Sequence, residues 1–275
     1  MSRISNEMRH LYLEKIKEYR ENIMALLQQE KTILTAIQQE PENASVKRIT
    51  LVDEMLNLTS YYILMSNIAQ SMLKNRNEDA LNDGRKSLYK SIIYLEEIVT
   101  NRVDAPFSDY EDKLAPLEPI DAARRYLLIR KMGLCIDLLE NAYGDNTKWR
   151  WAFVDMEGRY AAVAKNILDL KKVVVNTDPQ SPFYEPTVYH LRLVKGLLAQ
   201  AADRYREMYE LSTHRFGDFS MGIHFLGALR RIQVLLGNRE EAEMVKKKID
   251  IWSAKLELDA KGAQQKKVQD AKTES

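Results

Sequence analysis

The 275-residue sequence predicts an all-α fold, and three observations carry that prediction. All seven prolines fall in three places, at Pro41, within residues 106–119 and within residues 179–186. A proline inside a helix costs about 3 kcal/mol, so these places mark connections between helices. Between them the apolar residues recur at steps of three and four, and strand-like alternation is missing apart from a brief valine run at 173–175.

Four helices are expected in the first half of the chain, over residues 5–39, 45–74, 77–102 and 120–142. The first is typical, because Tyr12, Ile16, Tyr19, Ile23 and Leu26 lie at helical spacing. The segment VDAPFSDYEDKLAPLEP, residues 103–119, is acidic and bears prolines. We therefore expect a linker here, which separates amino-terminal helical hairpins in 1–102 from carboxy-terminal hairpins in 120–258.

Four further helices are expected over residues 147–174, 187–213, 219–236 and 239–258. The first two are separated by a second proline-bearing connection, VNTDPQSPFYEP. From residue 259 to residue 275 the sequence has almost nothing to bury, which predicts a flexible tail.

The expected helix 147–174 carries two apolar stripes. One consists of Trp149, Phe153, Met156, Tyr160, Val163, Ile167, Leu170 and Val174. The other consists of Trp151, Val154, Gly158, Ala161, Lys165 and Leu168, and it starts about 200° around the helix from the first. A helix with two stripes contacts neighbours on two sides, as an interior helix of a layered array does. Trp149 is therefore expected to be largely buried, with Trp151 on the stripe of smaller residues.

A short helical-hairpin turn is expected in LLGNREEAEMVKKKI, residues 235–249. Gly237 suits the left-handed conformation that ends a helix, and Asn238 can accept hydrogen bonds from the first turn of the next. Glu240 and Glu241 then lie where the helix dipole favours negative charge.

This hairpin resembles the tetratricopeptide-like repeats, which have a Gly turn, an acidic pair and an Ala packed between two helices. Here Gly237, Glu240, Glu241 and Ala242 match, whereas Arg230 and Gln233 depart from the family's Gly and aromatic residue. A second, partial match to the repeat occurs in LKNRNEDAL, residues 73–81. No 34-residue period connects the two segments. The resemblance implies an irregular array of about eight antiparallel helices, as an α-solenoid or a bundle.

Composition excludes several classes of protein. Lys and Arg number 41 against 40 Asp and Glu, so no overall charge favours nucleic acid or an anionic membrane. No apolar run approaches 18 residues, and the charged start MSRISNEMRHLYLEK lacks the apolar core of a secretory signal. Cys135 is the single cysteine, so the chain holds neither a disulfide framework nor a CxxC metal site. A cytoplasmic location is expected.

Reaction motifs are missing from the sequence. The four histidines, His10, His190, His214 and His224, show no zinc-ligand spacing, and no Walker, GxGxxG or GxSxG motif occurs. We therefore expect no catalytic residue, no cofactor, no metal and no enzymatic activity.

The strongest polar pattern is basic and aromatic, in ARRYLLIRK at 123–131 and KWRW at 148–151. The candidate partner-binding residues are Trp151, Arg124, Arg125, Lys148 and Arg150. Converging in one groove, such cations bind phosphate on a phosphopeptide or a nucleic acid. The alternative is that Arg and Lys stems cover apolar surface and pair with nearby acids, and the balanced net charge favours it.

Taken together, these patterns favour a non-enzymatic helical-repeat scaffold or adaptor that binds a partner protein, or a subunit of a larger bacterial assembly. The alternative hypothesis is a phosphate-recognising helical module, and a third is an enzyme whose site assembles from scattered residues. Nucleic acid is a disfavoured partner, and a homo-oligomer is compatible with the sequence.

Overall fold

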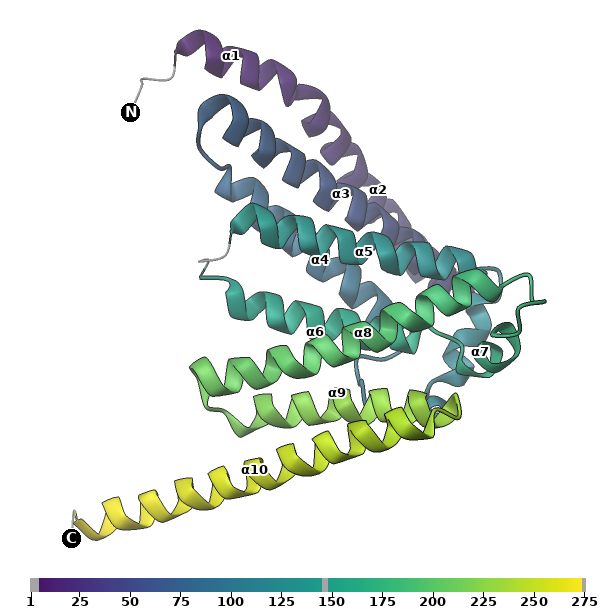
Figure 1. Ribbon diagram of the computed structural model, residues 1–275. Coiled ribbons are helices and arrows are strands. Elements are labelled where there is room, and N and C mark those ends of the chain that lie inside the picture. The colour runs from purple at the N-terminus through teal and green to yellow at the C-terminus, as the bar shows by residue number, and fades with distance from the viewer. Residues whose placement is uncertain (1–4, 145–147, 274–275) are drawn as a thin grey trace. The chain divides into compact units, whose positions relative to one another are not determined.

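The computed structural model describes residues 5–144 and 148–273, with side-chain surroundings as far as residue 265 (Figure 1). Every regular element in these residues is a helix, so the all-α prediction is confirmed. Packing divides the chain into two units. Unit 1 consists of Met1–Asn101 and Phe107–Asp169, and unit 2 of Arg102–Pro106 and Leu170–Ser275.

Unit 1 is built around α3, which packs against α1, α2, α4 and α5. Helices α3 and α5 run in the same direction: Lys131 bonds to Asp53 and Asn57, and one turn further along Cys135 lies against Leu56 and Ser60. The six α-helices are α1 (Asn6–Lys15), α2 (Lys17–Gln39), α3 (Ala44–Leu73), α4 (Glu78–Ile98), α5 (Ala122–Tyr143) and α6 (Arg150–Asn166). A short 3-10 helix, η1 (Pro41–Asn43), joins α2 to α3.

The helix expected over residues 5–39 is interrupted at Ile16. This residue lies between α1 and α2 with φ −88° and ψ −2°, and its side chain is completely buried. Both helices contact α3, so the bend allows a long amphipathic segment to follow one neighbour over its whole length.

The helix expected over residues 147–174 also divides. Helix α6 ends at Asn166, and a separate α7 (Leu170–Asn176) follows, while residue 147 lies outside the described residues. The Asn166 side chain is buried and its Nδ2 donates to the Thr100 carbonyl at 2.8 Å. Asp169 stands just before α7 and is a residue type that favours helix starts. A polar residue fixed in the core thus ends one helix where apolar spacing alone predicts continuity.

The two-stripe prediction is confirmed within α6. From Phe153 to Leu168 the members of both stripes are buried, including Gly158 and Lys165. Within unit 1 the helix contacts α4 and α5: Tyr89 donates to the Ala152 carbonyl, and Tyr160 donates to the Ile129 carbonyl.

The expected linker 103–119 is largely folded. Residues in it form two 3-10 helices, η2 (Phe107–Asp109) and η3 (Glu111–Leu117), and Tyr110, Leu114 and Leu117 are buried. The acidic residues of the segment face outward while these apolar ones pack. Along the chain, the boundary between the two units lies at 169–170. Residues 102–106 belong to unit 2.

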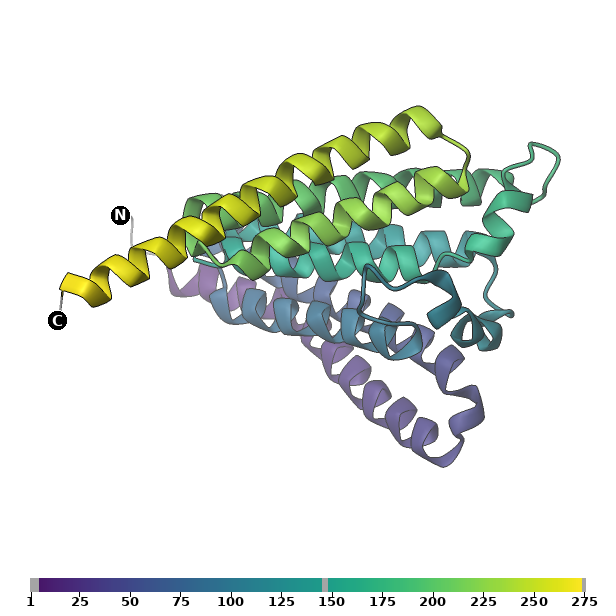
Figure 2. The ribbon, with the colours of Figure 1, turned by 90° about the horizontal axis from the view of Figure 1, so that it is seen from below.

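Unit 2 consists of α7, α8 (Tyr184–Met208), a π-helical turn η4 (Tyr209–Thr213), α9 (Phe216–Leu235) and α10 (Arg239–Thr273). Helix α9 packs against both α8 and α10, and α10 runs on well past the start of α9 (Figures 1 and 2). Aromatic rings fill the space between these helices: Tyr209 stacks on Phe219 at 5.0 Å, and Phe219 contacts Trp252 at 5.5 Å.

The turn between α9 and α10 is the predicted hairpin. Gly237 has φ +74°, and the amides of Gly237 and Asn238 donate to the carbonyls of Val234 and Gln233. The Asn238 side chain donates to Gln233 Oε1 at 2.9 Å. Gln233, which departs from the tetratricopeptide pattern, therefore takes part in closing this turn.

The segment expected to be a flexible tail, 259–275, overlaps the last part of α10. Residues 274–275 and the side chains from 266 onward lie outside those described, so tail flexibility stays a prediction. Within the described residues no helix combines the length and the apolar character needed to cross a membrane.

Candidate partner-binding groove

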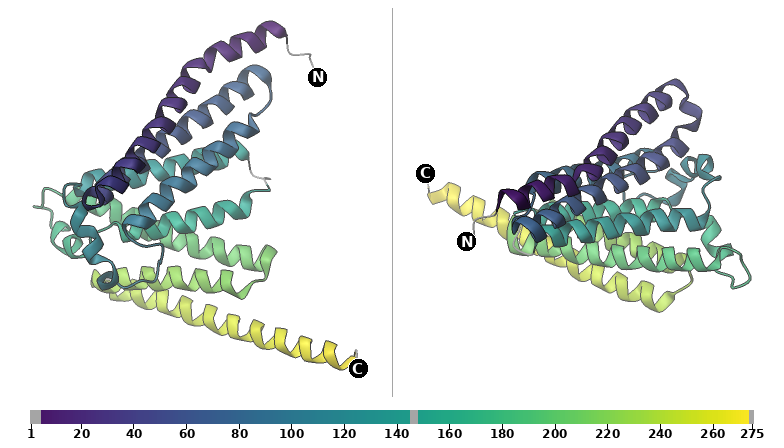
Figure 3. Two further views of the ribbon diagram at one scale, coloured as in Figure 1. Left: turned by 180° about the vertical axis from the view of Figure 1, so that it is seen from behind. Right: turned by 90° about the horizontal axis from the view of Figure 1, so that it is seen from above.

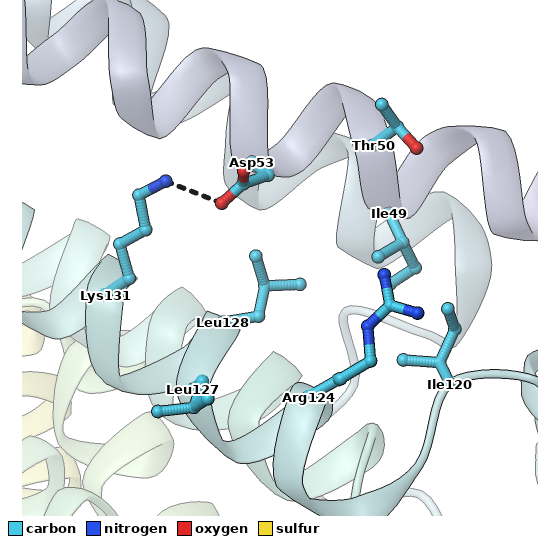
Figure 4. A pocket seen from close by; sticks show the side chains of 8 residues that line it. All are labelled: Ile49, Thr50, Asp53, Ile120, Arg124, Leu127, Leu128 and Lys131. Atoms are coloured by element: carbon cyan, nitrogen blue, oxygen red, sulfur yellow. Dashed lines mark hydrogen bonds and ion pairs between the residues drawn. The ribbon is translucent and has the colours of Figure 1, made fainter.

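A groove of about 370 Å³ lies in unit 1 between the first halves of α3 and α5 (Figure 4). Its lining is apolar on the floor and polar at both ends. The lining residues are Ile49, Thr50, Asp53, Ile120, Arg124, Leu127, Leu128 and Lys131.

One end of the groove is closed by an ion pair between the two helices. Lys131 Nζ lies 2.6 Å from Asp53 Oδ1 and 2.8 Å from Asn57 Oδ1. At the other end the Arg124 guanidinium extends beside Ile49 and Ile120 (Figure 4). Among the described residues, no acidic side chain pairs with this guanidinium, so Arg124 offers its charge to a ligand.

Beyond the groove, α5 exposes a row of leucines. Arg124, Leu127, Lys131, Leu134 and Leu138 follow steps of three and four, which places them on one face of the helix. Leu127 and Leu134 are each 57% exposed and Leu138 is 43% exposed. We call these five residues the α5 seam.

Helix α3 borders the α5 seam on one side. Asp53, Asn57 and Ser60 face α5, and Leu64, one turn further along the same face, is 42% exposed. Past the Lys131–Asp53 ion pair, exposed apolar side chains of both helices thus continue along the surface. A surface of this kind accommodates an amphipathic helix or an extended apolar peptide.

Arg125, a candidate partner-binding residue, is instead a structural residue. Its guanidinium is buried and donates to the carbonyls of Ile120 at 2.8 Å, Leu117 at 2.7 Å and Ile167 at 3.4 Å. Burial lowers the pKa of Arg125, and the nearby Asp169 and Asp121 oppose that shift. The side chain ties η3 and the start of α5 to the end of α6 and presents nothing to a partner.

Lys148, Arg150 and Trp151 are exposed or partly exposed at the start of α6. The Arg150 guanidinium covers the Trp151 ring at 4.8 Å, and Lys148 Nζ lies 5.2 Å from the Trp149 ring. Trp149 packs on Tyr143 at the end of α5, sixteen residues or about 24 Å along that helix from Leu127. The two halves of the basic pattern therefore do not converge on one groove.

The expected burial of Trp149 is only partly realised. Trp149 is the residue before α6 and stays intermediate in exposure; its ring contacts Tyr143 edge-on and has the Arg85 guanidinium over it at 4.0 Å. Completely buried stripe positions begin at Phe153, one turn later. A helix end has no preceding turn to cover it, which spacing alone does not reveal.

Two other basic side chains near this region, Arg159 and Lys131, are paired with acids. Arg159 makes a two-pronged bond to Glu96, at 2.8 Å from Nε and 2.6 Å from Nη2, and this bond raises the pKa of Arg159. Lys131 is held by Asp53. Such ion pairs are what the alternative to a phosphate site predicts, in which Arg and Lys side chains cover apolar surface and pair with nearby carboxylates.

Ionisable groups elsewhere in unit 1 join helices. Glu30 is buried on α2 and accepts from Tyr94 at 2.7 Å and Lys90 at 2.9 Å, both on α4. Burial, together with the bond to Glu30, raises the pKa of Tyr94. Cys135 is buried beside Ser60 and the Leu56 carbonyl, and burial raises the pKa of its thiol.

Sequence reasoning missed the leucines of the α5 seam. The signal was present, because Leu127, Leu134 and Leu138 form a second stripe beside the core stripe of Leu128, Met132 and Leu139. The same two-stripe criterion that identified α6 would have identified α5. It would not have distinguished a stripe covered by a neighbour from one left exposed.

The fold and the groove define an all-helical protein whose unit 1 presents an apolar, partly basic helix surface. The chain belongs to the TP0443 family, whose model matches residues 8–260. The family name by itself indicates no activity, ligand or partner. No curated protein and no solved structure matches the chain.

Proposed function

We propose that this protein is a non-enzymatic helical scaffold or adaptor that binds a partner protein through the groove and seam of α3 and α5. The observation that carries the proposal is the exposed leucine row of α5, which starts in the groove at Leu127 and runs on past the Lys131–Asp53 ion pair, with the Arg124 guanidinium at the opposite end of the groove. Exposed apolar rows of this length are a marker of protein interaction sites.

The chemistry of the surface defines the kind of segment it fits. An amphipathic helix would place apolar residues against Leu127, Leu134 and Leu138, and an acidic residue beside Arg124. The charge of Arg124 adds orientation, because an exposed ion pair contributes little affinity by itself. The resemblance to tetratricopeptide-like repeats supports the same role, since arrays of helical hairpins present extended binding faces.

Phosphate recognition is the weaker candidate on this geometry. Arg125 is buried, Lys131 and Arg159 are paired with carboxylates, and Lys148 and Arg150 lie at the far end of α5. Among the described residues that line the groove, Arg124 is the cation without a carboxylate partner, whereas tight phosphate binding uses several converging donors.

Site-specific photo-crosslinking in the native cell tests the proposal. A photoreactive residue at Leu134 should capture one defined protein, and the crosslinked peptide should lie in an amphipathic segment. Met24, which is 63% exposed on α2, provides the matched control position and should not capture the same protein. Crosslinks at Leu134 to many unrelated proteins, or to none, would contradict a dedicated groove.

Substitutions separate the two candidate chemistries. Leu134→Glu should abolish capture of that protein, and Arg124→Gln should weaken it only a few-fold, with a shallow dependence on salt. Loss of binding with Arg124→Gln together with a steep salt dependence would favour phosphate recognition instead. Arg125 is left unchanged in these experiments, because its replacement would disturb the fold.

A further inference from the structure

Helix α10 in unit 2 carries a second exposed seam that the groove in unit 1 does not use. Met244, Lys247, Ile251, Ala254 and Leu258 are all exposed and follow steps of three, four, three and four residues. Met244 is 62% exposed, and Ile251 and Leu258 are each 68% exposed. We call these five residues the α10 seam.

This spacing is the heptad repeat of a two-stranded coiled coil. The buried face of α10, which includes Ala242 and Trp252, packs against α9, and the α10 seam lies about 150° around the helix from it. A second helix can therefore dock on the α10 seam without displacing the first packing face. Figure 3 shows α10 continuing as a regular helix past α8 and α9.

The charges that flank the α10 seam are sorted by sign. The residues before Met244, Ile251 and Leu258 are acidic, namely Glu243, Asp250 and Glu257. The residues that follow the second position of each heptad are basic, namely Lys248 and Lys255. In a coiled coil, these two flanks face one another between helices and decide which partner is accepted and in which direction.

We propose that the α10 seam is a self-association site, at which two copies of this chain pair through a parallel two-stranded coiled coil. In that arrangement Glu243 faces Lys248 of the partner subunit, and Asp250 faces Lys255 of the partner subunit. An antiparallel pair would instead oppose acid to acid and base to base. The sorted charges are thus complementary to a second, parallel copy of the same helix.

Existing contacts of the two lysines are compatible with this pairing. Lys248 Nζ lies 2.8 Å from Asp203 Oδ1, and Lys255 Nζ lies 3.7 Å from Glu210 and 3.8 Å from Asp259. Both lysines remain more than one third exposed, and an ammonium group has three donors. Each can therefore bridge a carboxylate of its own unit and one of the second copy.

Length and polarity make the association modest. The described seam spans two heptads, and Lys247 interrupts it with a charge. Pairing is favoured, in contrast, by the order that α10 already has. Because α10 packs on α9, no free peptide has to become helical when the dimer forms. We expect a reversible dimer that dissociates on dilution.

Sedimentation of the full chain over a range of concentrations is the first test. A monomer–dimer equilibrium is expected, and Ile251→Glu or Leu258→Glu should raise the dimer dissociation constant at least about tenfold, since either change places a charge in the seam. Val175→Glu is the matched control, because Val175 is 69% exposed on α7 and should leave the constant unchanged. A chain that stays monomeric, or a dimer insensitive to both seam variants, overturns the proposal.

Single cysteines test the direction of pairing. Cys135 is only 2% exposed, so an introduced cysteine is the reactive one. Met244→Cys alone and Leu258→Cys alone should each form a disulfide-linked dimer, because identical positions meet in a parallel pair. Disulfides that form only when the two variants are mixed would show an antiparallel pair and overturn the arrangement. This test does not depend on the groove of unit 1 or its partner.

Discussion

The two units hold their helices together in different ways. In unit 1 many helix-to-helix links are polar: Glu30 bonds to Tyr94 and Lys90, Arg159 to Glu96, and Arg125 to three carbonyls. In unit 2 ring contacts join the helices: Tyr205 on α8 stacks on Phe225 of α9, and Tyr209 on η4 stacks on Phe219 of α9, which contacts Trp252 of α10.

This difference indicates which substitutions each unit tolerates. These hydrogen bonds join α2 to α4, α4 to α6 and the start of α5 to the end of α6, and they are costly to break because a buried polar group loses its partner. Ring packing is less directional but depends on filled volume. Unit 1 should therefore respond most to loss of polar partners and unit 2 to loss of volume.

The largest effect is expected from Trp252→Ala in unit 2. Trp252 is buried against Phe219, and removing a large core aromatic costs about 3–5 kcal/mol of the free energy of unfolding. Hydrogen exchange should lose protection in α8, α9 and α10. Lys246→Ala, an exposed change on the same helix, should leave protection unaltered, and equal effects from both would show that the rings do not carry the packing of unit 2.

A somewhat smaller effect is expected from Arg125→Met in unit 1. The change removes the guanidinium from three carbonyls, of which only that of Leu117 is known to keep another donor, the Ile120 amide, for a loss of about 3 kcal/mol. Urea unfolding measures the loss, and hydrogen exchange should place it in η3, α5 and α6. Arg124→Met alters the adjacent exposed arginine and should cost less than about 0.5 kcal/mol. A harmless Arg125→Met would mean that water replaces the guanidinium at these carbonyls.

Alkaline pH should weaken unit 1 through its tyrosines. Burial raises the pKa of Tyr89 to about 12, and burial also raises the pKa of Tyr160. A raised pKa stabilises the fold below the unfolded value near 10, and that contribution is lost as pH rises through the folded value. For Tyr89 the loss should be less than about 2 kcal/mol, because the side chain is partly screened by solvent.

Unfolding curves measured from pH 9 to 12 check this expectation, and Tyr89→Phe should flatten the decline. In unit 2, Tyr209 has a pKa raised to about 12, with burial as the largest cause. Exchange protection in α9 should therefore also decrease over this range. A stability that stays constant to pH 12 would contradict both assignments.

The smallest effect is expected at the turn of unit 2. Gly237 has φ +74° and no neighbour within 4 Å of an added side chain, so only the backbone opposes substitution. Gly237→Val should lower the free energy of unfolding by more than about 1 kcal/mol, and Gly237→Asn by clearly less. Thermal unfolding of the two variants compares them directly, and equal losses would argue against the left-handed conformation.

Periodicity predicted the helices well, and local polar contacts account for the misses. The two stripes of α6 and the left-handed Gly237 followed from spacing and residue type alone. The helix ends at Ile16 and Asn166 did not follow from spacing. The first depends on packing, and the second on a hydrogen bond from Asn166 to Thr100, 66 residues away.

The candidate site was predicted only in part. Arg124 lies at the groove and has no acidic partner among the described residues, whereas Arg125, its neighbour in sequence, is buried. One residue step turns a side chain by about 100° around the helix, and sequence does not say which direction faces solvent when several faces are apolar.

The division of the chain has a consequence for how the protein is made. Residues 102–106 group with a unit whose other members begin only at residue 170. On the ribosome, α1 to α6 can therefore assemble while Val103 and Ala105, both buried in the finished protein, still await residues not yet synthesised. These two side chains stay uncovered until residues of unit 2 emerge, so this interval is when the segment would be accessible to a chaperone.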